Sequence, residues 1–450
     1  MQSPAIAQYT QPHQFEPLLP QTGLDALRER SRAVIEQSLR LTAAAHPDTL
    51  ASLRELVREM NSYYSNRIEG QSTHPHNIGR ALRHDFSDKP DVARLQRVAL
   101  AHIDAERALE SDVGGSATPL SSAFIQQAHH ALYSRLNEAG RFTADGEVIS
   151  PGQWRTRQVA VGRHEPPPPE ALAAFLDRFD EVYTPPHRLE DQLIVAAAAH
   201  QRMAWIHPFI DGNGRACRLQ THCALWPLSG GLWSVSRGLA RRRDEYYERL
   251  DAADAPRQGD LDGRGNLSEK ELRRWCEWFV GICEDQVSFM TRMFHLDGMK
   301  TRIQALISFR AAHDKRIRPE AALPLYHLFL AGPTARGEFL QMTGLGERTA
   351  RTLLSNLIEA GLVTSTGHVA PVRFAFPLDA LQFLLPELYP EAATREARSP
   401  DSVQYHGHAA RWRRGFLGGK ARRALSIPPQ ARIASDGSSR VPRRVSRNAY

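Results

Sequence analysis

One run of the chain combines the residue types that bind and transfer phosphate groups. From His207 to Arg218 it reads HPFIDGNGRACR. Two glycines flank Asn213 and a helical pattern follows, so unpaired backbone N–H groups and the positive end of a helix would face an anion. Arg215 and Arg218 lie three residues apart, on one face of that helix, where guanidinium groups suit phosphate oxygens. The run predicts a phosphate-binding loop.

Two further residues of this run could supply the chemistry of group transfer. Asp211 offers the hard carboxylate oxygen that Mg²⁺ prefers when it bridges phosphates. His207, at the end of the preceding predicted helix, is expected to titrate near pH 7 and to act as base for a hydroxyl that attacks an α-phosphate. A Gly-x-Gly pair alone is typical of an ordinary turn, so the prediction depends on the whole run.

The run resembles the Fic family signature, HxFx(D/E)GNGRxxR, and fits it at every specified position. The resemblance implies that His207 deprotonates the target hydroxyl and that Asp211 holds Mg²⁺. Asn213 stands where the phosphorylating branch of the family carries Lys, which favours nucleotidyl transfer. The resemblance assigns the anion hole to Gly212, Asn213 and Gly214. It assigns the β- and γ-phosphates of ATP to Arg215 and Arg218.

Two other stretches resemble binding parts of this family. Residues 154–164 look like its β-hairpin flap, which pairs with the target segment as an added strand. Two adjacent tyrosines look like its adenine wall, although Asp254 stands where some relatives carry Asn, and such tyrosines are more often core residues. The nucleotide contacts predicted in these stretches are Val159, Ala160, Val161, Gly162, Tyr246 and Tyr247.

A second short motif precedes the phosphate-binding run. The segment SNRIEG, with Ser65, Glu69 and Gly70, fits the family's inhibitory pattern (S/T)xxxE(G/N). A helical pattern ends at Gly70, so Ser65 and Glu69 are expected one turn apart near a helix end. The resemblance implies an inhibitory helix in the same chain, in which Glu69 pairs with Arg218 and withholds that cation from the γ-phosphate. By itself, a Glu at a helix end is usually solvated.

The elements that must position these residues are predicted to be mainly α-helical. The expected fold is a Fic-type helical core with a β-hairpin flap, followed by a small winged-helix domain and a basic disordered tail. The predicted divisions are a disordered N-terminus (1–20), a helical region with the inhibitory motif (21–110), the Fic core (111–310), the winged-helix-like domain (311–388) and the tail (389–450).

The winged-helix assignment comes from the order of elements in residues 320–385: helix, helix, turn, helix and hairpin. Its recognition helix would be 347–360, where Arg348 and Arg351 are offset by Glu347 and Glu359. This balance makes DNA binding less favoured than protein docking.

Composition limits the remaining function classes. Residues 401–450 hold ten Arg and one Lys against two Asp, a net charge of +9 within a chain whose total is +7, so the rest of the chain, at −2, is close to neutral. The four cysteines have neither zinc-site nor disulfide spacing. With neither a membrane-spanning run nor a signal peptide in the sequence, we expect a cytoplasmic protein with no membrane partner.

The sequence therefore favours an autoinhibited protein adenylyltransferase. It would move AMP from ATP, with Mg²⁺, to a Ser, Thr or Tyr hydroxyl of a target protein, itself included. The alternatives are transfer of another nucleotide, removal of AMP at the same site, and a DNA-binding regulator. A homodimer remains open.

Overall fold

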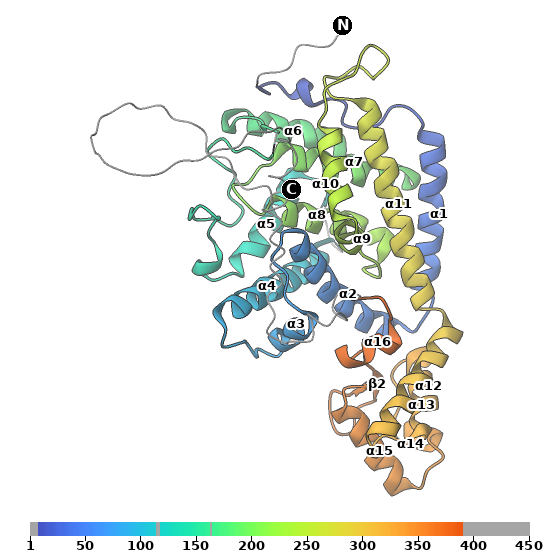
Figure 1. Cartoon of the computed structure of the whole chain (residues 1–450). Coiled ribbons are helices and arrows are strands. Elements are labelled where there is room, and N and C mark those ends of the chain that lie inside the picture. The colour runs from blue at the N-terminus through green and yellow to red at the C-terminus, as the bar shows by residue number, and fades with distance from the viewer. Residues whose placement is uncertain (1–7, 114–117, 163, 390–450) are drawn as a thin grey trace, which may run out of the picture.

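The protein is described here by a computed structural model that covers residues 8–113, 118–162 and 164–389 (Figure 1). The chain is mainly helical, as predicted. The helices of its larger part are α1 (Leu24–Thr42), α2 (Pro47–Ile68), α3 (Pro75–Leu82), α4 (Pro90–Val113), α5 (Ser122–Ser134), α6 (Leu172–Tyr183), α7 (Gln192–Ile206), α8 (Asn213–Ser229), α9 (Val235–Arg241), α10 (Arg243–Ala253) and α11 (Glu269–Met293).

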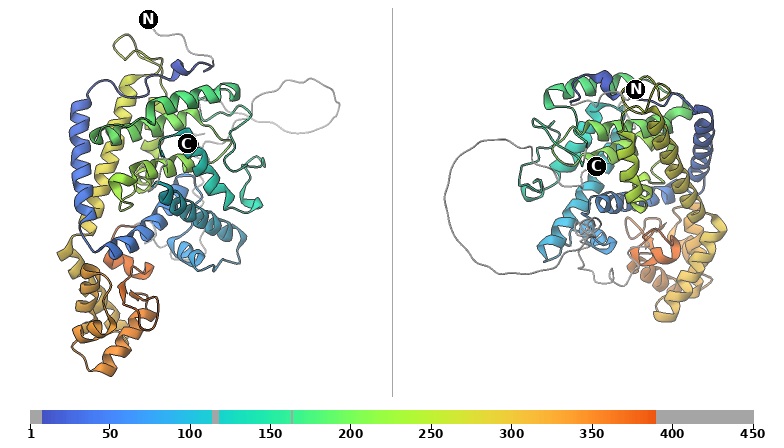
Figure 2. Two further views of the ribbon diagram at one scale, coloured as in Figure 1. Left: turned by 180° about the vertical axis from the view of Figure 1, so that it is seen from behind. Right: turned by 45° about the horizontal axis from the view of Figure 1, so that its top comes forward.

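The smaller, C-terminal part lies beyond one end of α2 and α11 in both Figure 1 and the left view of Figure 2. It contains α12 (Leu296–His313), α13 (Ala322–Ala331), α14 (Arg336–Met342), α15 (Glu347–Glu359), β1 (Val363–Thr364), β2 (Arg373–Phe374) and α16 (Leu381–Leu384). The two strands are antiparallel, with Val363 opposite Phe374. The order of elements agrees with the predicted one, while the winged-helix assignment stays a prediction.

Short 3-10 helices join these elements. They are η1 (Pro12–Phe15), η2 (Glu138–Gly140), η3 (Pro169–Ala171), η4 (Leu189–Asp191), η5 (Pro319–Ala321) and η6 (Leu378–Ala380).

Helix α7 is the centre of the core. Every residue from Leu193 to Ile206 is buried, which follows from a sequence that is apolar on almost every face. Ala196 to Ala199 have small side chains, so that neighbouring helices can pack close to the α7 backbone; α7 contacts α8, α11 and α6. Helices α1 and α11 pack side by side on the outside (Figures 1 and 2). This packing fixes both ends of the loop between α7 and α8.

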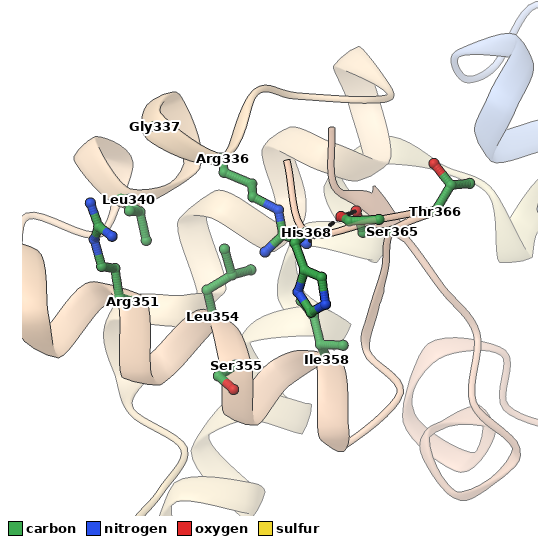
Figure 3. Close-up of a pocket in the computed structure, with 11 residues that line it drawn as sticks. Arg336, Gly337, Leu340, Arg351, Leu354, Ser355, Ile358, Ser365, Thr366 and His368 are labelled. Atoms are coloured by element: carbon green, nitrogen blue, oxygen red, sulfur yellow. Dashed lines mark hydrogen bonds between the residues drawn. The ribbon is translucent and has the colours of Figure 1, made fainter. Parts of the chain in front are cut away.

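The C-terminal part contains a cavity of about 660 Å³ between α14, α15 and the loop after β1 (Figure 3). Leu340, Leu354 and Ile358 are among its lining residues. Arg336 donates hydrogen bonds to the carbonyls of Gly367 (3.0 Å) and Ala370 (3.2 Å) and so holds the loop after β1 against α14.

Two predictions about local structure are wrong. Residues 8–20 are not disordered: Phe15 is fully buried and stacks on Trp205, with ring centroids 5.4 Å apart. Arg202 also donates to the carbonyl of Pro17 at 2.7 Å. The Pro/Gln-rich composition suggested disorder. The buried Phe15 ring and the hydrogen bond from Arg202 give this segment enough contacts to be ordered.

The expected β-hairpin flap is the second error. Among the described residues of 151–164 no strand forms, and the only pairing is an isolated bridge between Val161 and His164. The Arg155 side chain donates to the backbone carbonyls of His207 and Arg157, and its backbone N–H donates to that of Pro208. These bonds tie the segment to the loop between α7 and α8 and leave it as an irregular strap.

Some predictions concern residues outside the described ranges, and others can be compared with the structure. The basic tail falls in residues 390–450 and the N-terminal end in residues 1–7, both outside the described ranges. The cysteines are buried and unpaired within the described part of the chain, as expected. None of the described helices is both long and apolar enough to cross a membrane.

Candidate active site

The phosphate-binding run forms the loop between α7 and α8. His207 caps α7 in the left-handed conformation, with φ 50°, and Gly212 caps α8 with φ 80°. The Asn213 side chain closes the loop: its Nδ2 donates to the Phe209 carbonyl, its Oδ1 accepts from the Phe209 N–H, and both bonds are 2.9 Å long. The predicted anion-hole residues therefore form the rigid start of α8.

Gly212 is a position where only glycine fits. A Cβ atom there would lie 2.4 Å from the ring of Tyr133, and the positive φ also disfavours other residues. Gly212→Ala is expected to lower the free energy of unfolding by about 2–5 kcal/mol, from left-handed strain together with displacement of the buried Tyr133 ring. Urea unfolding of the purified protein measures this loss.

Gly146 provides the matched control. It has a similar φ of 84°, and its Cβ would meet no described atom within 4 Å. Gly146→Ala should therefore lose only the backbone contribution, about 1–2 kcal/mol. Equal losses in the two variants would contradict the close contact between Gly212 and Tyr133.

The two arginines of the motif lie buried on one face of α8, as predicted. Arg215 donates to the hydroxyl of Tyr133 at 2.6 Å and to Gln71 Oε1 at 3.1 Å. The Arg218 side chain is 1% exposed, and it donates from Nη2 to Glu69 Oε1 at 2.6 Å and from Nε to Ser65 Oγ at 2.9 Å. Both guanidinium groups thus have partners from the segment at the end of α2 or from α5.

Glu69 is the C-cap residue of α2, and Gly70 follows with φ 71°. The left-handed glycine turns the chain so that the Glu69 carboxylate faces α8, where its side chain is only 9% exposed. Burial raises the pKa of Glu69, while Arg218 and Arg215 oppose that shift. The pairing of Glu69 with Arg218, expected from the motif, is present in this conformation.

His207 differs electrostatically from the expectation of a group titrating near pH 7. It is 2% exposed, and its Nδ1 has no hydrogen-bond partner among the described residues. Burial, together with the nearby Arg155 and His164, lowers the pKa of His207 to about 3. The imidazole is therefore neutral at pH 7 in this conformation.

Asp211 lies beside the start of α8, and its carboxylate oxygens are of the ligand type that Mg²⁺ prefers. Its side chain is 33% exposed, its Oδ1 accepts from the Gly212 N–H, and it lies 4.0 Å from Arg215. One accessible carboxylate is what Mg²⁺ commonly takes from a protein when phosphates and water supply the other ligands.

The six other predicted nucleotide contacts lie in the strap of residues 151–164 and in the pair Tyr246 and Tyr247. Their side chains differ in how far they are buried. Val159 and Val161 are buried, Ala160 is half-buried and Gly162 is exposed. Tyr246 is fully buried and its hydroxyl lies 2.8 Å from His200 Nε2, whereas the half-buried Tyr247 donates to the carbonyl of Ile68 at 3.2 Å. The nucleotide contacts of these six residues stay predictions.

Sequence reasoning missed two side chains that support the loop from α5. His129 stacks on Phe209, with centroids 3.9 Å apart, and on Tyr133 at 4.5 Å. Its Nδ1 accepts from the Gly152 N–H at 2.9 Å, which leaves Nε2–H to donate to the Asp211 carbonyl at 3.1 Å. Their spacing of four residues in a predicted helix was the available signal, but it is equally typical of core packing.

Comparisons with known proteins find similarity over part of the chain. Residues 119–225 match the Fic/DOC family. "Protein adenylyltransferase Fic" of Drosophila virilis is 30% identical over 143 residues, which are 32% of this chain and 28% of that protein. The Drosophila grimshawi protein of the same name is 30% identical over 200 residues, 42% of this chain and 39% of that protein. A solved structure of Fic-1 from C. elegans aligns with a TM-score of 0.47 at 19% identity, over 62% of this chain and 74% of that one. The chain thus spans well under half the length of the two Drosophila relatives.

Proposed function

We propose, from the Fic/DOC domain that residues 119–225 of this chain form, that the protein is an adenylyltransferase that moves AMP from ATP to a hydroxyl of a protein. The observation that carries this proposal is the loop between α7 and α8. It combines a neutral, buried His207 with a helix N-terminus and two buried arginines. Relatives named protein adenylyltransferase support the same class of reaction.

In this proposal His207 takes the proton of the attacking Ser, Thr or Tyr hydroxyl. The oxygen then attacks the α-phosphorus, and pyrophosphate leaves. The N–H groups at the start of α8 and the side chains of Arg215 and Arg218 bind phosphate oxygens, and they stabilise the negative charge that develops during transfer. Asp211 would hold Mg²⁺, which would supply positive charge against the phosphates.

We further propose that the observed conformation is inhibited. Arg218 donates from Nη2 to Glu69 and from Nε to Ser65, so among the described residues only its Nη1 has no partner, and the paired edge of the guanidinium is not available to a γ-phosphate. A buried guanidinium exchanges such partners only when the competing anion offers comparable hydrogen bonds. Self-modification, a homodimer and a role for the C-terminal part in docking belong to the same proposal.

The proposed reaction is tested by comparing two labelled forms of ATP. The full chain, incubated with Mg²⁺ and α-³²P-ATP, should become labelled on itself or on lysate proteins, whereas γ-³²P-ATP should leave no label. Label from γ-³²P-ATP would indicate phosphorylation instead. If neither form labels any protein, even with Glu69→Gly, the transferase proposal is wrong.

The pH dependence of the reaction tests the state of His207. A base works in its neutral form, so a lowered pKa extends activity toward acid. In a Glu69→Gly background, kcat/KM for labelling, which reports the free enzyme, should change less than about two-fold between pH 7.5 and 5.5. A base with the ordinary histidine pKa would lose about ten-fold over this interval, and that result would contradict the buried, neutral imidazole.

A further inference from the structure

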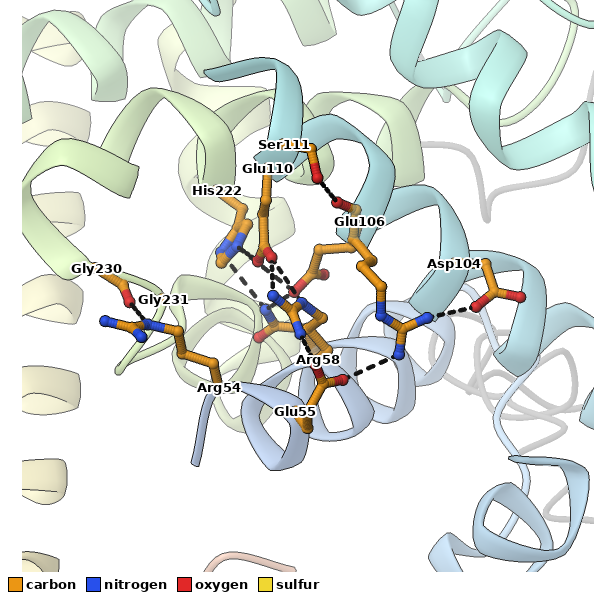
Figure 4. A network of polar contacts seen from close by, with 12 residues as sticks. Arg54, Glu55, Arg58, Asp104, Glu106, Glu110, Ser111, His222, Gly230 and Gly231 are labelled. Carbon is orange, nitrogen blue, oxygen red and sulfur yellow. Dashed lines mark hydrogen bonds and ion pairs between the residues drawn. The ribbon is translucent and has the colours of Figure 1, made fainter. Parts of the chain in front are cut away.

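A buried polar cluster lies between α4 and α8, one turn beyond Arg218 (Figure 4). It consists of Glu106, Glu110 and His222, whose ligand atoms all lie within 4.8 Å of one another. His222 Nε2 is 2.8 Å from Glu110 Oε1 and 3.5 Å from Glu106 Oε1. All three residues are less than 9% exposed. The proposed transfer reaction uses none of them.

Both carboxylates are oriented by residues of α2. Arg58 Nε donates to Glu110 Oε2 at 2.6 Å, and Asn61 Nδ2 donates to Glu106 Oε1 at 2.7 Å. The Arg58 bond leaves the other oxygen of Glu110 directed at His222. Neighbours that hold ligand carboxylates in this way are typical of metal sites.

A second observation concerns a buried histidine beside the cluster. His102 lies one turn before Glu106 on α4 and is 1% exposed. Neither of its ring nitrogens has a hydrogen-bond partner among the described residues, and Nδ1 lies 3.8 Å from Glu106 Oε2. The side-chain oxygen of Asn61 is likewise buried and, within the described chain, unpartnered. Buried polar atoms in native proteins are nearly always satisfied by protein, water or an ion.

We propose that Glu106, Glu110 and His222 bind one divalent cation of the zinc class. Two carboxylates and an imidazole nitrogen favour Zn²⁺ over Mg²⁺, which prefers oxygen ligands alone. The cation would compensate the charge of two buried carboxylates, only one of which has an arginine partner here. The competing occupant is a proton on His222. This site is separate from Asp211.

Metal content and stability test the site. The full chain, stripped with chelator and titrated with Zn²⁺ at pH 7.5, should bind one equivalent and melt several degrees higher. Glu106→Gln and His222→Gln should each weaken zinc binding at least ten-fold, about the effect of losing one ligand or its support. Asp211→Asn and Glu55→Gln should leave binding unchanged, because Asp211 lies in the loop between α7 and α8 and the side-chain hydrogen bonds of Glu55 go to Arg58 and Arg107 rather than to a proposed ligand.

Two outcomes would overturn the zinc site. One is a wild-type chain that binds less than about a tenth of an equivalent with an unchanged melting temperature, which would leave a proton as the occupant. The other is unaltered zinc affinity in Glu106→Gln. This variant keeps the side-chain shape and an oxygen for Asn61, so it still tests the site if His222→Gln fails to fold.

An independent set of contacts joins the C-terminal part to α2, the helix that ends at Glu69. The Tyr64 hydroxyl donates to the Leu388 carbonyl at 2.8 Å, and the Tyr389 ring packs on Tyr63 and Tyr64 with centroids 5.5 and 6.2 Å apart. At the other end of α2, Thr49 Oγ1 donates to the Phe329 carbonyl at 3.0 Å. Helix α2 is thus fixed at its first turn and within two turns of Glu69.

We infer that residues 381–389 hold α2 in the inhibited position, an inference that rests on the proposed role of Glu69. Ser65 and Glu69, the two partners of Arg218, lie one and five residues after Tyr64. A shift of this end of α2 would move both away from α8. Release of residues 381–389 would therefore free Arg218 for phosphate.

Labelling of single and double variants tests this inference. Tyr389→Ala should raise self-labelling from α-³²P-ATP several-fold in the wild-type chain and add nothing in a Glu69→Gly background. Leu323→Ala, at an exposed position of α13, is the control and should change nothing. If Glu69→Gly raises labelling but Tyr389→Ala does not, the restraint by residues 381–389 is wrong. If neither variant raises labelling, the inhibitory role of Glu69 fails and this inference fails with it.

Discussion

Replacement of Glu69 by glycine is expected to raise self-labelling from α-³²P-ATP roughly ten- to hundred-fold, which corresponds to about 1.4–2.8 kcal/mol of lost preference for the inhibited state. The Glu69 carboxylate accepts from Arg218 at 2.6 Å in a site that is almost closed to water. Without it, Arg218 keeps only its bonds to Ser65 and can turn toward a γ-phosphate. Because Glu69 is the C-cap of α2, glycine there does not interrupt the helix interior.

Two glutamine variants distinguish the effect of the Glu69 charge on labelling from the effect of its side-chain shape. Glu69→Gln keeps the size of the side chain but removes the ionic contact, so it should also raise labelling. Glu55, on the same helix, pairs with Arg58 and Arg107 at a more exposed position, and Glu55→Gln should leave labelling within about two-fold. Unchanged or lower labelling in a folded Glu69→Gly protein would exclude the inhibitory role.

Replacement of His207 by asparagine in the Glu69→Gly background is expected to lower labelling by about 10²–10⁴-fold, the usual effect of removing a general base. Asparagine is the better test than alanine, because it tolerates the left-handed conformation that His207 adopts with φ 50°. The His207 carbonyl would still accept from Arg155. The loop should therefore keep its shape while the reacting hydroxyl loses its proton acceptor.

Nucleotide binding distinguishes loss of chemistry from loss of structure. The His207→Asn variant should still show a rise in melting temperature with ATP and Mg²⁺, since the arginines and the start of α8 are unchanged. His130→Asn, at an exposed position of α5, is the histidine control and should label normally. A folded His207→Asn protein that labels as fast as its parent would assign the base to another group.

Much of the candidate site could be predicted because its residues are contiguous. The run from His207 to Arg218 holds the helix end, the glycine turn and both arginines, so their proximity follows from local backbone geometry. The contact of Glu69 with Arg218 could be predicted only through a second motif, since 149 residues separate the two. His129 and Tyr133 carried no such signal, because aromatic side chains four residues apart look the same in a core as beneath a binding loop.

The two errors in local structure have a common cause. Residues 154–164 of the strap were expected to form a hairpin from their resemblance to the family's flap, but the bonds of Arg155 go to the carbonyls of His207 and Pro208 rather than across a sheet. Residues 8–20 were expected to be disordered from composition, but Phe15 and Pro17 find partners on α7. In both cases long-range contacts override local preference.

The sequence by itself determined the helical character of the chain, the phosphate-binding motif and the identity of the residues that could act on ATP. These follow from apolar spacing and from residue types placed next to one another. Only the tertiary structure decided that His207 is buried and neutral rather than titrating near pH 7. It also decided that Arg218 is held by Glu69 and that α4 and α8 enclose Glu106, Glu110 and His222. The physical reason is that burial and distance set pKa values, ion pairs and metal affinity, and both quantities depend on segments far apart in the chain.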